Sequence, residues 1–295
     1  MNVGTFLTGV VLLGAAIGVA AQAPVTPQNP LRRQYIEGQA LKYHMTGINE
    51  KWHYSIDAVG QVKKDAGGVF YEEYQWVNMV SDGQPVVLTG AADYRQRLTL
   101  DPNRNPSAPD LGKVDPKMIG PITDLMTFYV DLWLPNKLGA VRKAGDHFLF
   151  RNPMPVSSWA DGTHLLIGED AIDFDITLTS VDAAAGTATL VVRHVPPEKA
   201  KVNLPAAWMQ VPVGDAANNW VEVEKEQNGT YTASVGEETF TVEMKVSLAD
   251  GKILSATMDN PVKTIQRVCE DEALTKCGEA KPHLILRKIG IELVQ

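Results

Sequence analysis

Residues 240–258 read FTVEMKVSLADGKILSATM, and the alternation in this stretch decides the fold. Apolar residues occupy every second position from 240 to 248, which is typical of a β-strand with one buried face. A type I turn with Gly251 in the left-handed conformation then returns the chain as a second strand. The turn predicts three apolar pairs on one face: Val242 with Met258, Met244 with Ala256, and Val246 with Leu254.

The same period of two continues through most of the chain. Residues 221–235 predict a hairpin around Asn228-Gly229 that pairs Val223 with Ala233 and Val221 with Val235. Further hairpins are expected at 172–195, where Asp175 lies opposite Arg193, and at 41–56 and 69–88, with a last strand at 284–294. About ten to twelve strands joined mainly by tight turns indicate an antiparallel meander.

One segment, residues 122–134, has helical spacing instead, with Pro121 at its first turn and Pro135 at its end. Its polar stripe is thin, so most of its surface must be covered. We therefore predict a mainly β fold: an antiparallel meander that forms an open or half barrel, with one apolar helix packed on the concave face.

The N-terminal region indicates the compartment. No charged side chain precedes Arg32, and the apolar run ends in small residues, which is typical of a signal peptide at 1–21. A Pro-rich tether at 22–34 and a single β-rich domain at 35–295 would follow. The protein is expected to be periplasmic or secreted without a stable membrane span; an uncleaved anchor is the alternative.

Composition excludes several classes. The 27 Lys and Arg against 35 Asp and Glu give a net charge of −8, which argues against nucleic acid as a partner. The two cysteines, Cys269 and Cys277, are predicted to pair as a structural disulfide in an oxidising compartment.

Metal and catalytic motifs are weak. Matching the apolar faces at Tyr43 and Tyr54 places His44 opposite His53, whereas a two-residue shift places His53 opposite Thr46; either way a third metal ligand is missing. No nucleophile elbow, phosphate loop or zincin motif occurs. We expect no metal, no cofactor and no catalytic residue.

Aromatic residues are the remaining candidates for a site. Phe128, Tyr129 and Trp133 lie on the predicted helix, and Trp208 lies in a Pro-rich loop. They either pack as core or line a ligand cavity between helix and sheet.

The opening Gly38-Gln39-Ala40-Leu41-Lys42-Tyr43 and the hairpin around Ala249-Asp250-Gly251-Lys252-Ile253 give the chain an architectural resemblance to the periplasmic lipoprotein-carrier superfamily of half barrels. The block from Thr123 to Tyr129 also resembles uncharacterised secreted bacterial proteins. The carrier resemblance implies a non-enzymatic binding protein for an apolar small molecule, a lipid or a lipid-linked partner.

Two alternatives remain open. A cell-envelope structural or interaction module would have a packed interior and no cavity. A hydrolase using carboxylates and histidine would bring His147, His164 and an acidic residue into one cleft. The sequence leaves the oligomeric state undetermined.

Overall fold

The computed structural model describes residues 29–112, 114–152, 164–169, 172–196, 202, 206–215 and 218–294. The expected signal peptide at 1–21 and residues 22–28 of the expected tether lie outside this range. The described elements include one α-helix, α1 (Pro116–Leu138), and one short 3-10 helix, η1 (Ala207–Gln210). The described strands belong to one sheet: β1 (Ala40–Asn49), β2 (Trp52–Lys64), β3 (Phe70–Ser81), β4 (Gln84–Pro85), β5 (Gln96–Leu98), β6 (His147–Phe150), β7 (His164–Glu169), β8 (Asp173–Asp182), β9 (Thr187–Val195), β10 (Trp220–Lys225), β11 (Tyr231–Glu238), β12 (Phe240–Ser247), β13 (Ile253–Cys269) and β14 (Lys281–Leu293).

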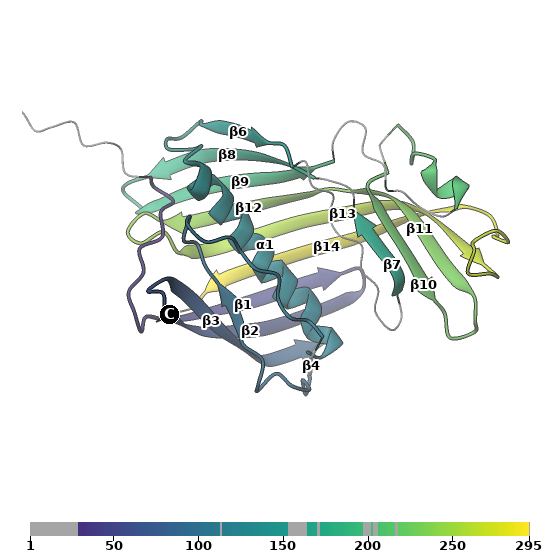
Figure 1. The fold of residues 1–295 in the computed structure, drawn as a ribbon, viewed down its shortest axis with the longest axis horizontal. Helices are drawn as coiled ribbons and strands as arrows, with labels where there is room; N and C mark the ends of the chain where they lie inside the picture. Colours follow the sequence, from purple (N-terminus) through teal and green to yellow (C-terminus); the bar gives the residue numbers. More distant parts are fainter. Residues whose placement is uncertain are drawn as a thin grey trace, which may run out of the picture.

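The antiparallel sheet has the order β4-β3-β2-β1-β14-β13-β12-β9-β8-β6, and it is not closed into a barrel. β13 is 17 residues long because it pairs with β12 along its first half and with β11 along its second. β10 and β7 extend the sheet beyond β11. α1 lies across one face of the central strands (Figure 1). The predicted open, mainly β architecture with one helix is therefore confirmed.

Apolar pattern and turn chemistry predict the main registers correctly. The observed pairs include Val221 with Val235, Val223 with Ala233, Val242 with Met258, Met244 with Ala256, and Asp175 with Arg193. One predicted pair is displaced, because a bulge makes Val246 face Ile253 instead of Leu254.

The predicted register of the first hairpin is wrong. β1 and β2 meet at a two-residue turn that includes Glu50, so His44 lies opposite Asp57 and His53 lies opposite Ile48. Glu50 has a φ of 54°, a conformation that Asn or Gly usually signals in such turns. Because neither Asn nor Gly stands at this position, the sequence pattern predicted the turn too early in the chain. The error spans an even number of residues, so the apolar faces still match.

The predicted ends of the helix are also wrong. α1 begins at Pro116, where Asp115 caps the first turn, and it ends at Leu138, where Gly139 forms the C-cap with a left-handed φ of 59°. Pro121 and Pro135 therefore lie inside the helix rather than at its limits. The capping residues set the ends of this helix, and both prolines are accommodated between them.

The N-terminal segment at 29–34, expected to be tether, packs against the domain. Leu31 is fully buried. Beside it, the carbonyl oxygen of Arg32 approaches the β12–β13 turn so closely that a Cβ on Gly251 would lie only 2.3 Å away. Gly251 also has a φ of 69°, so this turn requires glycine for both reasons.

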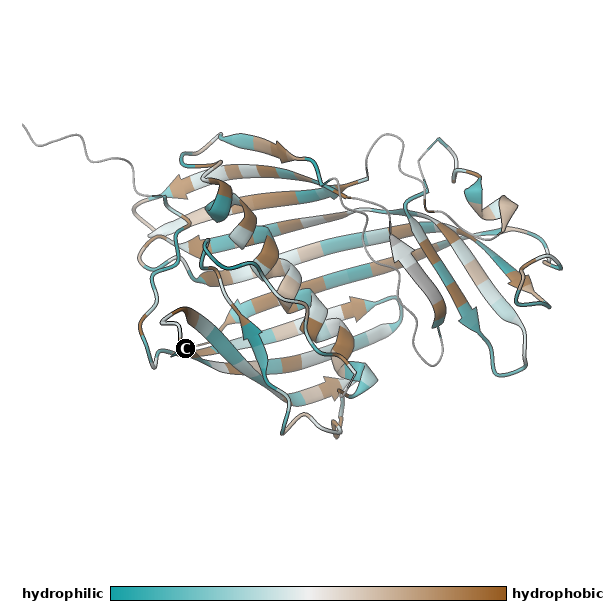
Figure 2. Cartoon of the chain, viewed as in Figure 1, coloured by the Kyte–Doolittle hydropathy of each residue, from teal (hydrophilic) through white to brown (hydrophobic). Residues whose placement is uncertain are grey.

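Two hydrophobic clusters lie on opposite faces of the sheet. The larger, here called the main core, lies between α1 and the sheet and includes Met258; the smaller surrounds β10, β11 and η1 and includes Cys269. β13 pairs without a register shift between these two residues. Since they are an odd number of positions apart, their side chains point to opposite faces. Figure 2 shows hydrophobic residues along α1 and alternating bands on the strands.

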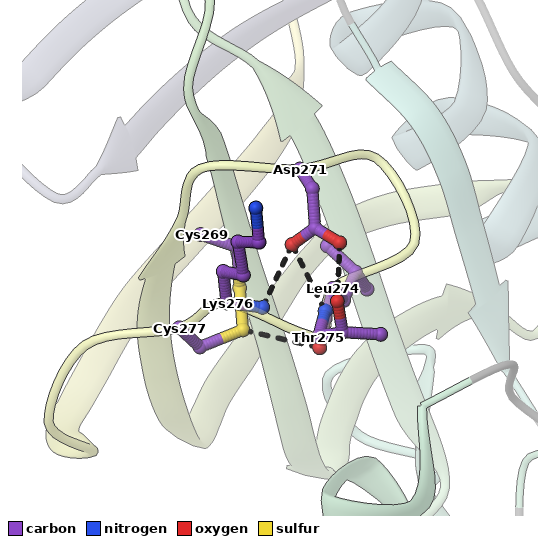
Figure 3. Close-up of a disulfide and its surroundings, with 6 residues drawn as sticks. All are labelled: Cys269, Asp271, Leu274, Thr275, Lys276 and Cys277. Carbon is purple, nitrogen blue, oxygen red and sulfur yellow. Dashed lines mark hydrogen bonds between the residues drawn. A yellow bond between two sulfur atoms is a disulfide. The ribbon is translucent and has the colours of Figure 1, made fainter.

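The predicted disulfide is present. Cys269 and Cys277 are bonded to each other and close a short loop beside the smaller cluster (Figure 3). Within that loop, the carboxylate of Asp271 accepts hydrogen bonds from the backbone N–H groups of Thr275 and Lys276, at 3.0 and 2.8 Å. The loop is thus ordered by its own side chains as well as by the covalent bond.

Candidate functional site

Three of the four candidate aromatic residues lie together. Phe128, Tyr129 and Trp133 are buried in the main core, where they fill the space beside the sheet. Trp208 lies apart from them, in the smaller cluster on the opposite face, with the guanidinium of Arg267 4.7 Å from its ring. The structure therefore concentrates the candidate site on α1 and the strands beneath it.

α1 is covered on its outer side by the loop at 99–110. Trp133 donates its indole N–H to the carbonyl oxygen of Asp101 (3.0 Å). One turn later, Lys137 donates to Oδ1 of Asn105 (2.6 Å), and its ammonium lies 4.6 Å from the Trp133 ring. An apolar helix needs this cover as well as the sheet, which accords with its thin polar stripe.

The side of α1 that faces the sheet carries ionisable residues. Asp124 accepts a hydrogen bond from Arg287 of β14 at 2.9 Å and another from the hydroxyl of Tyr54 at 3.3 Å. Arg287 also donates to Asn260 (2.7 Å), which in turn donates to Glu238 (2.8 Å). Burial raises the pKa of Asp124, and the neighbouring Arg287 opposes that rise.

A second contact lies two turns further along α1. Both carboxylate oxygens of Asp131 are 2.9 Å from Nε2 of His194 on β9. Asp131 is fully buried, and His194 lies between Phe240, whose ring centroid is 3.7 Å away, and Phe174, at 4.6 Å. Burial raises the pKa of Asp131, which His194 partly offsets, so this pair is held in a dry environment.

The third contact involves the candidate residue Tyr129. Its hydroxyl hydrogen-bonds to the buried carboxylate of Glu72 on β3 and lies 2.8 Å from the hydroxyl of Tyr74. The other carboxylate oxygen of Glu72 accepts from Nε of Arg33 at 2.9 Å. Burial raises the pKa of both tyrosines well above 10, so both hydroxyls are protonated at neutral pH.

These three pairs, Asp124–Arg287, Tyr129–Glu72 and Asp131–His194, are called the polar α1 contacts below. In the sequence, Asp124 and Asp131 belong to the thin polar stripe of the predicted helix, and no role was predicted for their partners. The spacing of seven residues between the two aspartates was the available signal, because it places both on one face of a helix.

Methionine is frequent in the main core. Its buried methionines are Met45, Met79, Met118, Met244 and Met258. They come from four strands and from α1 itself. Unbranched, polarizable side chains of this kind adapt to ligands of different shape.

Surface hollows lie elsewhere. A groove of about 1020 Å³ crosses β1, β14, β13 and β12. A pocket of about 250 Å³ lies between the loop at 99–110 and one edge of α1, where Tyr129 and Met126 border it. Neither Phe128 nor Trp133 lines these two hollows. Phe128 and Trp133 are instead buried among the side chains of the main core.

Histidines are dispersed over the described chain, and five of the six, all except His53, lie beside a carboxylate of their own. His147 lies 2.7 Å from Asp175 and His164 lies 3.0 Å from Glu222, on separate parts of the sheet. They do not form the single cleft that a hydrolase would need. Among the described residues, no group of three or more His, Cys, Asp or Glu is placed to hold a metal ion.

Asp57 lies on the face of the sheet opposite α1, where three side chains contact its carboxylate. It accepts hydrogen bonds from Asn78 (3.0 Å) and His44 (2.8 Å) and pairs with Lys42 (2.9 Å). Burial alone would raise the pKa of Asp57, but these hydrogen bonds outweigh it and lower the pKa to about 2. This cluster stabilises the β1–β2 pairing on the face opposite α1.

Comparisons with known proteins leave the family open. No protein-family model matches the chain, and a search of curated proteins finds no match. In the part of the chain that the structure describes, no helix has the length and apolar character needed to cross a membrane.

Proposed function

We propose that this chain is a secreted or periplasmic carrier that binds an apolar ligand, or the lipid of a lipid-linked partner, without catalysing a reaction. The ligand would lie between α1 and the sheet, with α1 acting as a movable cover. The observation that carries the proposal is the set of polar α1 contacts, which puts ionisable groups on the buried side of the helix.

The polar α1 contacts occupy positions that apolar side chains could fill. A buried ion pair adds little net stability compared with apolar side chains of the same size, because both charges must lose their water. The pairs nevertheless fix the position of α1, because each hydrogen bond forms only in one arrangement of the helix and the sheet. An interface held in this way closes in one defined arrangement and opens more easily than a wholly apolar one.

The surface beneath α1 suits an apolar ligand. Lifting the helix would uncover the methionines of β1, β12 and β13, together with Phe128 and its neighbours on α1 itself. Because methionine side chains change shape at little cost, they could repack around an acyl chain or another apolar group. The disulfide is consistent with the proposed oxidising compartment.

A second candidate is an envelope interaction module without a ligand cavity. This candidate is supported by Phe128 and Trp133, which are buried in the main core and line none of the three hollows of the described chain. In that case binding would involve the uncovered face of the sheet.

Fluorescence titration with an apolar probe separates the two candidates. Asp131→Asn removes one charge from a polar α1 contact while keeping the side-chain size, so it should favour the open state. If opening becomes easier by ~1.4 kcal/mol, the apparent affinity for the probe should rise about tenfold. Asp93→Asn, at an exposed carboxylate that takes no part in the polar α1 contacts, is the control. Absence of saturable binding to both wild type and Asp131→Asn would favour the interaction module.

A further inference from the structure

The face of the sheet opposite α1 carries an ordered row of side chains. Strand pairing places one residue from each of seven adjacent strands directly opposite the next: Ile48, Lys288, Asp259, Thr241, Arg193, Asp175 and Leu149. Their sequence neighbours Met258, Val242 and Val192 belong to the main core. Because side chains alternate along a strand, the row points away from α1.

The row is complementary to itself when its order is reversed. From β1 to β6 it reads apolar, positive, negative, hydroxyl, positive, negative, apolar. Reversal places unlike charges together and like apolar groups together: Lys288 on Asp175, Asp259 on Arg193, Ile48 on Leu149, and Thr241 on itself. A second copy of the chain presents this reversed row when it is turned about an axis parallel to the strands.

Three of the four charges in this row are available for a partner, and the fourth, Asp175, lies 2.7 Å from Nε2 of His147. Arg193, Asp259 and Lys288 are exposed, and no ion pair is formed by any of them with another described residue. The two apolar ends are also exposed, Ile48 by 37% and Leu149 by 42%. The reversed row places these two apolar residues against each other, so neither end of the row leaves an apolar side chain facing a charge.

We propose that this face binds a second copy of the chain, with the two-fold axis running along β12. Asp259 of each copy then meets the partner's Arg193, and Lys288 meets the partner's Asp175. On β12 itself, the axis places Glu243 beside the partner's Glu243, so this contact opposes dimerisation and the pairs at Asp259 and Lys288 must outweigh it.

The size of the face is sufficient for such a dimer. The row crosses seven strands that are spaced about 4.8 Å apart, so it is roughly 29 Å long. The eight residues of β12 cover about 27 Å in the other direction. The resulting footprint is close to the ~800 Å² per partner that standard interfaces bury. The groove over β1, β14, β13 and β12 lies within this footprint.

Charge reversal tests the pairing directly, by sedimentation velocity on the purified full-length domain. Wild type should be a dimer that weakens as salt is raised. Asp259→Arg and Arg193→Asp should each place like charges together and weaken dimerisation by about 100-fold or more. Both positions are exposed, so the variants should keep the circular dichroism and thermal midpoint of wild type.

Mixing the two variants is the decisive experiment. An Asp259→Arg copy and an Arg193→Asp copy are complementary at both contacts, so their equimolar mixture should recover a dimer. The double variant should also dimerise. Glu37→Arg, a reversal at an exposed residue outside the row, should leave the dimer unchanged. A monomeric wild type, dimeric single variants or a mixture that remains monomeric would each overturn the proposal. None of these results depends on ligand binding under α1.

Discussion

The contact between Asp131 and His194 allows the sharpest test of how α1 is held. Asp131→Ala removes a fully buried carboxylate and leaves the imidazole between two phenylalanine rings without its partner. Breaking one side of a buried pair costs about 3–5 kcal/mol, because the remaining polar group stays desolvated. For a domain of this size the melting temperature should fall by roughly 10 °C.

The free energy of unfolding should change less when both partners are replaced. The double variant Asp131→Leu, His194→Phe fills the site with apolar groups that match Phe174 and Phe240, so the free energy of unfolding should stay within about 1.5 kcal/mol of wild type. Guanidinium unfolding followed by tryptophan fluorescence measures both midpoints, with Asp93→Ala as a surface control. A loss below about 1 kcal/mol for Asp131→Ala, equal to that of the control, would refute the reasoning.

Three further predictions follow from the same structure. Alkylation without reductant should label neither Cys269 nor Cys277, and replacing both by serine should cost about 2–3 kcal/mol of unfolding free energy. Asp57 has a pKa of about 2 in the folded chain, which is below its ordinary value. Its ionised carboxylate therefore stabilises the fold by on the order of 2 kcal/mol above about pH 4. This stabilisation should be lost as the pH falls toward 2, and Asp57→Asn should flatten this part of the stability profile. Trp133→Ala should cost about 3–5 kcal/mol, because the indole is buried and bonded to the loop at 99–110; a loss near zero would mean that the ring does not pack as core.

The hairpins were predictable because two independent signals agree in them. In the turns at Gly229 and Gly251, glycine supplies the left-handed conformation, and the apolar residues on both sides then allow only one register. The turn at Glu50 also contains a residue with positive φ but no glycine, so only the face of each strand could be predicted there.

The polar α1 contacts could not be predicted from the sequence for a different reason. Asp131 and His194 are 63 positions apart, and local patterns carry no information about which strand lies beneath a helix. A carboxylate on an apolar helix is more often a solvent-facing residue than a buried partner. The same limit applies to Trp208, because the sequence did not predict the face of the sheet on which it packs.

Native mass spectrometry of the chain purified from its own cells tests the carrier proposal most directly. We expect an added mass that organic extraction removes and that proves to be a lipid or another apolar compound. The added mass should return when the extract is mixed with the stripped protein. A chain that carries no added mass, and that takes up none from such an extract, would contradict the proposal that an apolar ligand lies between α1 and the sheet.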